Sequence, residues 1–410
     1  MRRFLTPNHL VPAAIIVAVA AMVAYANWRD VQRSKWPHTS GSPMGTQGAP
    51  MTSRGDLDAR IRDMESRLAA NPEDNGAALL LADALLRQTR VTGNPGLAVE
   101  AERALTRVLN DEPGSYDANR MLAALYLSQH RFRDALAVGE RNRDARPADP
   151  VNYGVIGDAH LELGEYDEAF AAFDKMMQTR PSAAAYARVA YARELQGNLA
   201  GAIESMALAA DATSPTDPEG LAWARAQLGD LYFQVGKLHE AKVAYASASQ
   251  AFPGHPFAVI GYAKAIASEG DPNGALELLR GAAAKSPTPD VFVKMGDLLE
   301  QLGRHDEAER QYALAEAAWR TEAPEPKNLA RFLADHDRKI EEAVAIAEKA
   351  AAERHDIFTE DALAWSYFKA GRVADARRAM AQALRTGTRD AGIRAHAQAI
   401  ETGAPRIAAR

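Results

Sequence analysis

The chain has no cysteine, few aromatic residues and no excess of basic charge. The absence of cysteine among 410 residues excludes disulfide bonds, thiolate metal sites and cysteine nucleophiles. Aromatic residues make up 7% of the chain, and 48 basic against 54 acidic residues give a formal net charge of −6. A general nucleic-acid-binding protein is therefore not expected, because such proteins carry a basic face.

The sequence also lacks the usual motifs of catalysis and metal binding. Six residues separate Gly229 from Gly236, where a phosphate-binding loop needs four. The ten histidines include no pair on one helical turn beside a glutamate, and no serine lies in a G-x-S-x-G motif. We therefore predict a protein with no catalytic residue, no metal, no cofactor and no small-molecule substrate.

Prolines recur along the chain at a fixed interval. Pro113, Pro147 and Pro181 are spaced by 34 residues, and the same interval separates Pro253 from Pro287. A proline cannot continue a helix without a clash with the preceding turn. The recurrence predicts repeated helical units that each end at a proline.

The unit between Pro147 and Pro181 predicts two short helices. Asp149 caps the first helix, because its carboxylate can accept from free N–H groups, and Gly164 ends it in a left-handed conformation. Gly157 and Ala169 are the small residues at which the two helices are expected to cross.

This 34-residue helix-turn-helix period, with small residues at its eighth and twentieth positions, resembles the tetratricopeptide repeat family over about four fifths of the chain. The resemblance implies an all-α fold, a right-handed superhelical α-solenoid of about nine helix pairs whose first helices line a concave groove. We expect the stack over residues 55–403, closed by capping helices near Leu57–Ala70 and Arg389–Glu401, with a frayed tail at 404–410.

The first 36 residues are expected to form a membrane anchor. Seventeen residues from Leu10 to Ala26 are uncharged and largely apolar, and Trp28 and several basic residues follow. The alternative is a signal peptide cleaved after Ala26. We prefer an uncleaved anchor, because the apolar run reaches this position without a polar segment.

Residues 37–54 are rich in Gly, Ser, Pro and Thr and predict a flexible linker. Together with the anchor, the linker predicts a single-pass protein of the inner (cytoplasmic) membrane whose repeat domain lies on the exported, periplasmic side.

The resemblance implies that positions 2, 5, 9, 12 and 13 of each first helix face the groove. In repeats three to seven these positions hold seven acids and the single base Lys264, so we expect an acidic groove. The acids are Asp158, Glu162, Glu194, Asp230, Asp290, Asp297 and Glu300, and the interleaved aromatic residues are Tyr191, Trp223, Phe233 and Phe257, with Trp365 and Phe368 in repeat nine. We expect Trp223, Phe233, Trp365 and Phe368 to be at least partly exposed. The alternative is that the acids bond neighbouring helices and the aromatic residues fill contacts between repeats.

These features predict a membrane-tethered adaptor that holds a protein or peptide segment, favoured if basic, in its groove. Two alternatives remain open. One is a non-catalytic subunit of an envelope enzyme system such as cytochrome maturation, and the other is a structural spacer that oligomerises.

Overall fold

The computed structural model describes residues 53–321 and 326–403, and every regular element of these two ranges is a helix. The helices are α2 (Arg54–Ala70), α3 (Asn75–Thr92), α4 (Pro95–Asp111), α5 (Tyr116–Ser128), α6 (Phe132–Ala145), α7 (Pro150–Leu163), α8 (Tyr166–Thr179), α9 (Ala183–Leu195), α10 (Leu199–Ala212), α11 (Pro218–Gln234), α12 (Leu238–Ala251), α13 (Pro256–Ser268), α14 (Pro272–Ala283), α15 (Pro289–Gln301), α16 (His305–Thr321), α17 (Pro326–Asp335), α18 (Ile340–Glu353), α19 (Ile357–Lys369), α20 (Val373–Ala383) and α21 (Ala391–Thr402). Within these ranges they form nine consecutive pairs, α3–α4 to α19–α20, flanked by α2 and α21. The predicted all-α solenoid with capping helices is thereby confirmed.

Local sequence signals set the helix ends as expected. Asp149 caps α7 by accepting a hydrogen bond from the Val151 N–H, and Gly164 ends the helix at a φ of 83°. In the eighth repeat Asp337 replaces the usual glycine and has a φ of 53°. Asparagine and aspartate tolerate this left-handed conformation better than most residues do.

Glycines on the first helices make room for aromatic rings of the second helices. A Cβ atom on Gly157 would lie 2.4 Å from the ring of Phe173. The Tyr245 ring is held in the same way between Gly229 and Gly261, where a Cβ atom would approach it to 2.5 Å and 2.2 Å. The two helices therefore cross closely at Gly157, where a Cβ atom would meet the Phe173 ring and would also lie 3.1 Å from the backbone carbonyl oxygen of Ala169.

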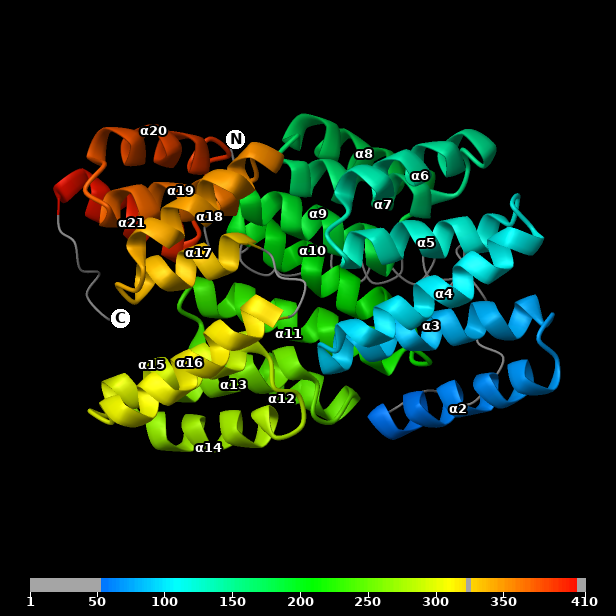
Figure 1. Cartoon of the computed structure of the whole chain (residues 1–410), viewed down its shortest axis with the longest axis horizontal. Helices are drawn as coiled ribbons and strands as arrows, with labels where there is room; N and C mark the ends of the chain where they lie inside the picture. The colour runs from blue at the N-terminus through cyan, green and yellow to red at the C-terminus, as the bar shows by residue number, and fades with distance from the viewer. Residues whose placement is uncertain (1–52, 322–325, 404–410) are drawn as a thin grey trace, which may run out of the picture.

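The solenoid curls until distant repeats touch. In Figure 1 the C-terminal helices α17–α21 lie beside α7–α9, although more than 100 residues separate them in the chain. Near the other end, Arg90 on α3 donates to Glu219 on α11, and the Ser286 hydroxyl donates to the carbonyl of Thr92. Each end of the solenoid therefore contacts repeats in its middle.

The predicted anchor at 1–36, most of the linker at 37–54 and the tail at 404–410 lie outside the described residues. Among the helices of 53–321 and 326–403, none is both long and apolar enough to span a bilayer.

Candidate protein-binding surface

Polar contacts link successive first helices along one face, which we call the inner wall. The Arg188 guanidinium on α9 binds Asp158 on α7 at 2.6 Å, and Gln234 on α11 donates to Glu194 on α9 at 2.5 Å. The next link joins α13 to α11, because the Lys264 ammonium lies 3.9 Å from Asp230. The inner wall therefore runs across α7, α9, α11 and α13.

The centre of the inner wall combines a cation, an acid and an aromatic ring. The Lys264 ammonium lies 4.0 Å from the centroid of the Phe233 ring, and the Tyr245 hydroxyl donates to Asp230 at 2.8 Å. Burial raises the pKa of the Asp230 carboxyl above its ordinary value, although Lys264 and Tyr245 both act to lower it. These groups are thus only partly solvated, and a charge that approaches them interacts more strongly than it would in open water.

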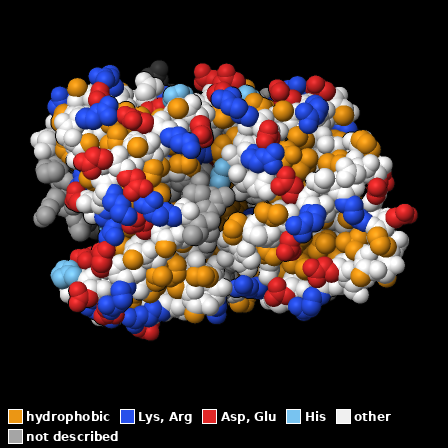
Figure 2. All heavy atoms as spheres, in the orientation of Figure 1, with side chains coloured by type: hydrophobic (Ala, Val, Ile, Leu, Met, Phe, Trp, Pro, Cys, Tyr) orange, Lys and Arg blue, Asp and Glu red, His pale blue; other side chains and the backbone are white. Residues whose placement is uncertain are grey.

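Most inner acids already have a basic or hydroxyl partner. Besides Asp158, Glu162 lies 3.4 Å from Arg354, Asp297 lies 3.1 Å from His336 and Glu300 lies 2.8 Å from His305. The seven-to-one excess of acids therefore overstates the charge of the wall. Figure 2 shows acidic and basic side chains interspersed over the face in view.

The recurring Gly-Asp pair explains why some of these acids are structural. In repeats five and seven the aspartate accepts from the tyrosine packed on the neighbouring glycine, Tyr245 to Asp230 and Tyr312 to Asp297. In repeat three the packed ring is Phe173, which has no hydroxyl, and Asp158 pairs with Arg188 instead. These three acids therefore bond neighbouring helices.

Two inner acids differ from the others. Within the described residues, Glu194 and Asp290 have no basic nitrogen within 4.0 Å. Burial raises the pKa of both carboxyls. Lys264 lowers the pKa of Glu194, and Lys294 and Arg331 lower that of Asp290, without outweighing burial.

The predicted aromatic residues divide into two groups. Phe257 is 45% exposed, and Tyr191, Trp223 and Phe233 are half-buried. The prediction of exposure is wrong for Trp365 and Phe368, which are 1% and 8% exposed. Both lie in the C-terminal core. The Trp365 ring stacks on His396 of α21 at 4.3 Å, so the capping helix covers the face on which a groove was expected.

Sequence reasoning missed the basic residues that neutralise the wall. Arg188 falls outside the five positions counted, and Lys327 and Arg354 belong to the distant eighth repeat. No spacing rule connects repeats three and eight. Their pairing with Glu162 depends on how far the solenoid curls.

The fold and this wall define an all-helical repeat protein. A family model described as "Tetratricopeptide repeat" matches residues 155–218 and 226–289, which is less than half of the chain. No curated protein matches the chain significantly.

Solved structures are similar in fold. The crystal structure of the APC/C hetero-tetramer Cut9-Hcn1 includes a chain with a TM-score of 0.51 at 14% identity, covering 84% of this chain and 59% of that one. The human IFIT1 dimer with m7Gppp-AAAA gives a TM-score of 0.53 at 15% identity, covering 82% and 77%. This chain thus spans little more than half of the Cut9-Hcn1 chain that it matches, and the likeness concerns the helical solenoid.

Proposed function

We propose that this protein is a non-enzymatic adaptor whose inner wall binds a segment of a partner protein. The observation that carries the proposal is that an exposed aromatic side chain, a lysine and acidic side chains occur together at the centre of the inner wall. An exposed aromatic side chain, Phe257, lies on the same helix as Lys264 and two turns before it. Asp290, an acid with no basic nitrogen of the described residues within 4.0 Å, belongs to the first helix of the next repeat, and Glu194 belongs to the first helix two repeats before α13.

A large exposed apolar group commonly marks a binding surface, and aromatic anchors supply most of the energy in such interfaces. Phe257 and Lys264 are seven residues apart on α13, a spacing that places both on one helix face. An extended or helical peptide that buries Phe257 would bring its own basic residues close to Glu194 or Asp290. We therefore favour a partner segment with a hydrophobic anchor and at least one Lys or Arg.

We further propose that the adaptor is tethered to a membrane. It is supported by the apolar run at Leu10–Ala26, the basic residues around it and the Gly/Ser/Pro-rich linker at 37–54. With this anchor the repeat domain would act on the periplasmic side of the inner membrane, in the assembly of envelope protein complexes. Fractionation of cells that express the full chain, with protease access to the repeat domain, tests the tether separately from the groove.

Site-specific photo-crosslinking in cells tests the groove. A photoreactive phenylalanine analogue replaces Phe257, and the matched control replaces Leu314 on α16, since the two side chains are 45% and 48% exposed. We expect a discrete protein adduct from position 257 that is lost when Glu194→Lys and Asp290→Lys are added, and no such adduct from position 314. Equal adducts from both positions would refute the assigned wall.

A second candidate function, an oligomerising spacer, is favoured by a different observation. Four large apolar side chains are exposed on the second helices of successive repeats. They are Leu208 on α10, Val243 on α12, Leu278 on α14 and Leu314 on α16. Sedimentation of residues 53–403 decides this point. A stable homo-oligomer that dissociates on Val243→Lys would support the spacer, and a monomer would exclude it.

A further inference from the structure

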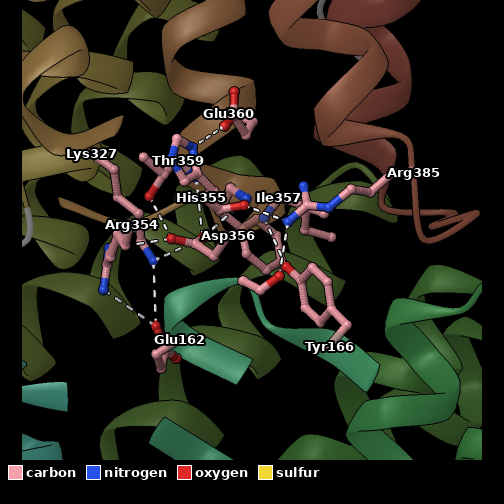
Figure 3. A network of polar contacts seen from close by, with 12 residues as sticks. Glu162, Tyr166, Lys327, Arg354, His355, Asp356, Ile357, Thr359, Glu360 and Arg385 are labelled. Carbon is pink, nitrogen blue, oxygen red and sulfur yellow. Dashed lines mark hydrogen bonds and ion pairs between the residues drawn. The ribbon is translucent and has the colours of Figure 1, made fainter. Parts of the chain in front are cut away.

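One end of the inner wall is closed by the fold itself. Glu162 on α7 lies 3.4 Å from Arg354 and 3.7 Å from Lys327, which reach it from the C-terminal repeats (Figure 3). Around these charges, residues of α7–α9 and of α13–α21 share one continuous buried apolar core, which contains both Phe173 and Trp365. The stretch of wall that is left to a ligand therefore runs along the first helices α9, α11, α13 and α15.

Two aromatic side chains and an acid lie at the same end of this stretch. Trp223, Phe257 and Asp290 each occupy the second position of a repeat, in repeats five, six and seven. Equivalent positions of stacked repeats lie side by side, and α11 packs directly on α13. Phe257 is 45% exposed, Asp290 is exposed and Trp223 is half-buried. This end of the wall therefore offers an apolar surface beside an accessible carboxylate.

The described part of the chain begins beside this surface. The Arg54 guanidinium, at the start of α2, donates to the carbonyl of Lys285 at 2.7 Å, in the loop that leads into α15. The hydroxyl of the next residue, Ser286, donates to the carbonyl of Thr92. Asp290 follows Lys285 by five residues, so their Cα atoms lie at most about 18 Å apart. The preceding part of the chain is therefore attached close to the aromatic end of the wall.

A segment of that preceding part has the chemistry that the wall favours. Residues 28–36, WRDVQRSKW, carry a tryptophan at each end, three cations and one acid. Aromatic side chains are the commonest anchors of protein interfaces, and opposite charge adds specificity. The segment thus meets, within the same chain, both conditions given above for a partner, a hydrophobic anchor and at least one Lys or Arg.

The connection between this segment and the repeats has a suitable length. Residues 37–52 belong to the predicted linker, and a Gly/Ser-rich chain of that length spans a root-mean-square distance of about 20–24 Å. A tether of this reach gives the segment an effective concentration at the wall on the order of 1 mM. Even a contact with a dissociation constant of about 0.1 mM would then be formed about ten times as often as it is broken.

We propose that residues 28–36 of this chain occupy the inner wall when no partner is bound, and that a partner segment must displace them. Trp36, the anchor nearest the linker, packs against Phe257. Its neighbour Lys35 pairs with Asp290. The inference rests on the proposed binding function, because it assigns a second ligand to the same wall. Occupancy by the segment lowers the apparent affinity for a partner about tenfold, so that only a tightly binding partner reaches the wall.

Zero-length crosslinking detects this contact in the intact protein. The full chain is placed in lipid nanodiscs without a partner, and a carbodiimide couples lysine to a nearby carboxylate with loss of water. We expect an amide bond between Lys35 and Asp290, identified by mass spectrometry. A mixture of isotope-labelled and unlabelled chains separates links within one chain from links between chains. The ion pair of Lys242 and Glu269, 2.6 Å apart, gives the internal control link.

Trp36→Ala removes the anchor without altering any contact of the described repeats. Because the loss of an aromatic anchor weakens a contact about thirtyfold, the yield of the Lys35–Asp290 link should fall at least about threefold. The control link between Lys242 and Glu269 should keep its yield. The matched variant His38→Ala lies just outside the segment and should change neither link.

Competition by a free peptide measures the same occupancy in a second way. A fluorescein-labelled peptide of residues 28–36 is titrated with the full chain and followed by fluorescence anisotropy. The Trp36→Ala chain should bind this peptide at least about fivefold more tightly than the wild type, because its own segment no longer competes. Adding Asp290→Lys to the Trp36→Ala chain should weaken peptide binding at least about threefold, since the peptide then meets a cation at the wall.

Three results would overturn the proposal. They are the absence of the Lys35–Asp290 link while the control link forms, the absence of peptide binding, and equal peptide affinity of the two chains. A missing link together with a bound peptide would assign residues 28–36 to the bilayer interface, which tryptophan and lysine also favour. None of these results involves a foreign partner. A foreign adduct from position 257 would still support the adaptor function, and a contact with residues 28–36 without such an adduct would refute the adaptor alone.

Discussion

The clamping of Tyr245 between two glycines gives the sharpest test of how the repeats are held. In Gly229→Ala the new Cβ atom would lie 2.5 Å from Cε1 of the Tyr245 ring, whose side chain is fully buried. The ring cannot retreat, because Gly261 lies against its other face at a distance that would leave a Cβ atom only 2.2 Å away. The neighbouring helices must therefore separate.

Overpacking of this kind costs about 1–3 kcal/mol, and the clamped ring places Gly229→Ala near the upper end. Alanine recovers about 1 kcal/mol through its better helix propensity. The net expectation is a loss of about 2 kcal/mol in the free energy of unfolding.

The matched control is Gly281→Ala on α14, where a Cβ atom would meet nothing within 4 Å. It should gain up to about 1 kcal/mol from helix propensity alone. Urea unfolding followed by circular dichroism measures both variants. If Gly229→Ala proved as stable as Gly281→Ala, the crossing would not be tightly packed and the argument would fail. A Gly229→Ala, Tyr245→Leu double variant should cost less than the sum of its two changes, since the smaller side chain removes the clash.

Three further predictions concern charge and backbone conformation. Burial alone would lower the pKa of His396, but its carboxylate partners outweigh burial and raise that pKa to about 9 from 6.5. Because the raised pKa favours charged His396, this residue stabilises the fold by roughly 3 kcal/mol below about pH 6.5, and the stabilisation is lost as the pH rises through 9. Between about pH 6.5 and 9 the melting temperature should therefore fall more in the wild type than in His396→Ala. Arg90→Ala leaves the 3% exposed Glu219 without its bidentate partner. In urea unfolding this variant should lose about 2–3 kcal/mol of the free energy of unfolding. The control Arg372→Ala, at an exposed ion pair, should lose less than about 1 kcal/mol. His130 has a φ of 59°, so His130→Gly should relieve about 1 kcal/mol of strain and raise the melting temperature; an unchanged value would show that the turn is not strained.

The repeat architecture was predictable because its signals are local. A helix cap such as Asp149, a left-handed glycine such as Gly164 and a glycine facing a ring such as Gly157 each depend on residues within one 34-residue unit. Recurrence of these signals fixes the helix pairs, and the small residues fix how each pair crosses.

The candidate site was less predictable, because it depends on side chains from different repeats. Family positions placed Phe257 and Lys264 on one face of α13, and the structure agrees in leaving Phe257 exposed. The same rule failed for Trp365, because family positions carry no information on the capping helix α21, which covers the last helix pair, α19–α20. It also counted acids without the cations that approach them from other helices, such as Arg188.

The sequence by itself determined the helices, their pairing and the caps at both ends, because hydrogen bonding and packing within a repeat involve neighbours along the chain. Only the tertiary structure decided where the solenoid meets itself. The small rotation between successive repeats accumulates from the third pair to the eighth, and this sum brings Arg354 to Glu162 across 192 residues.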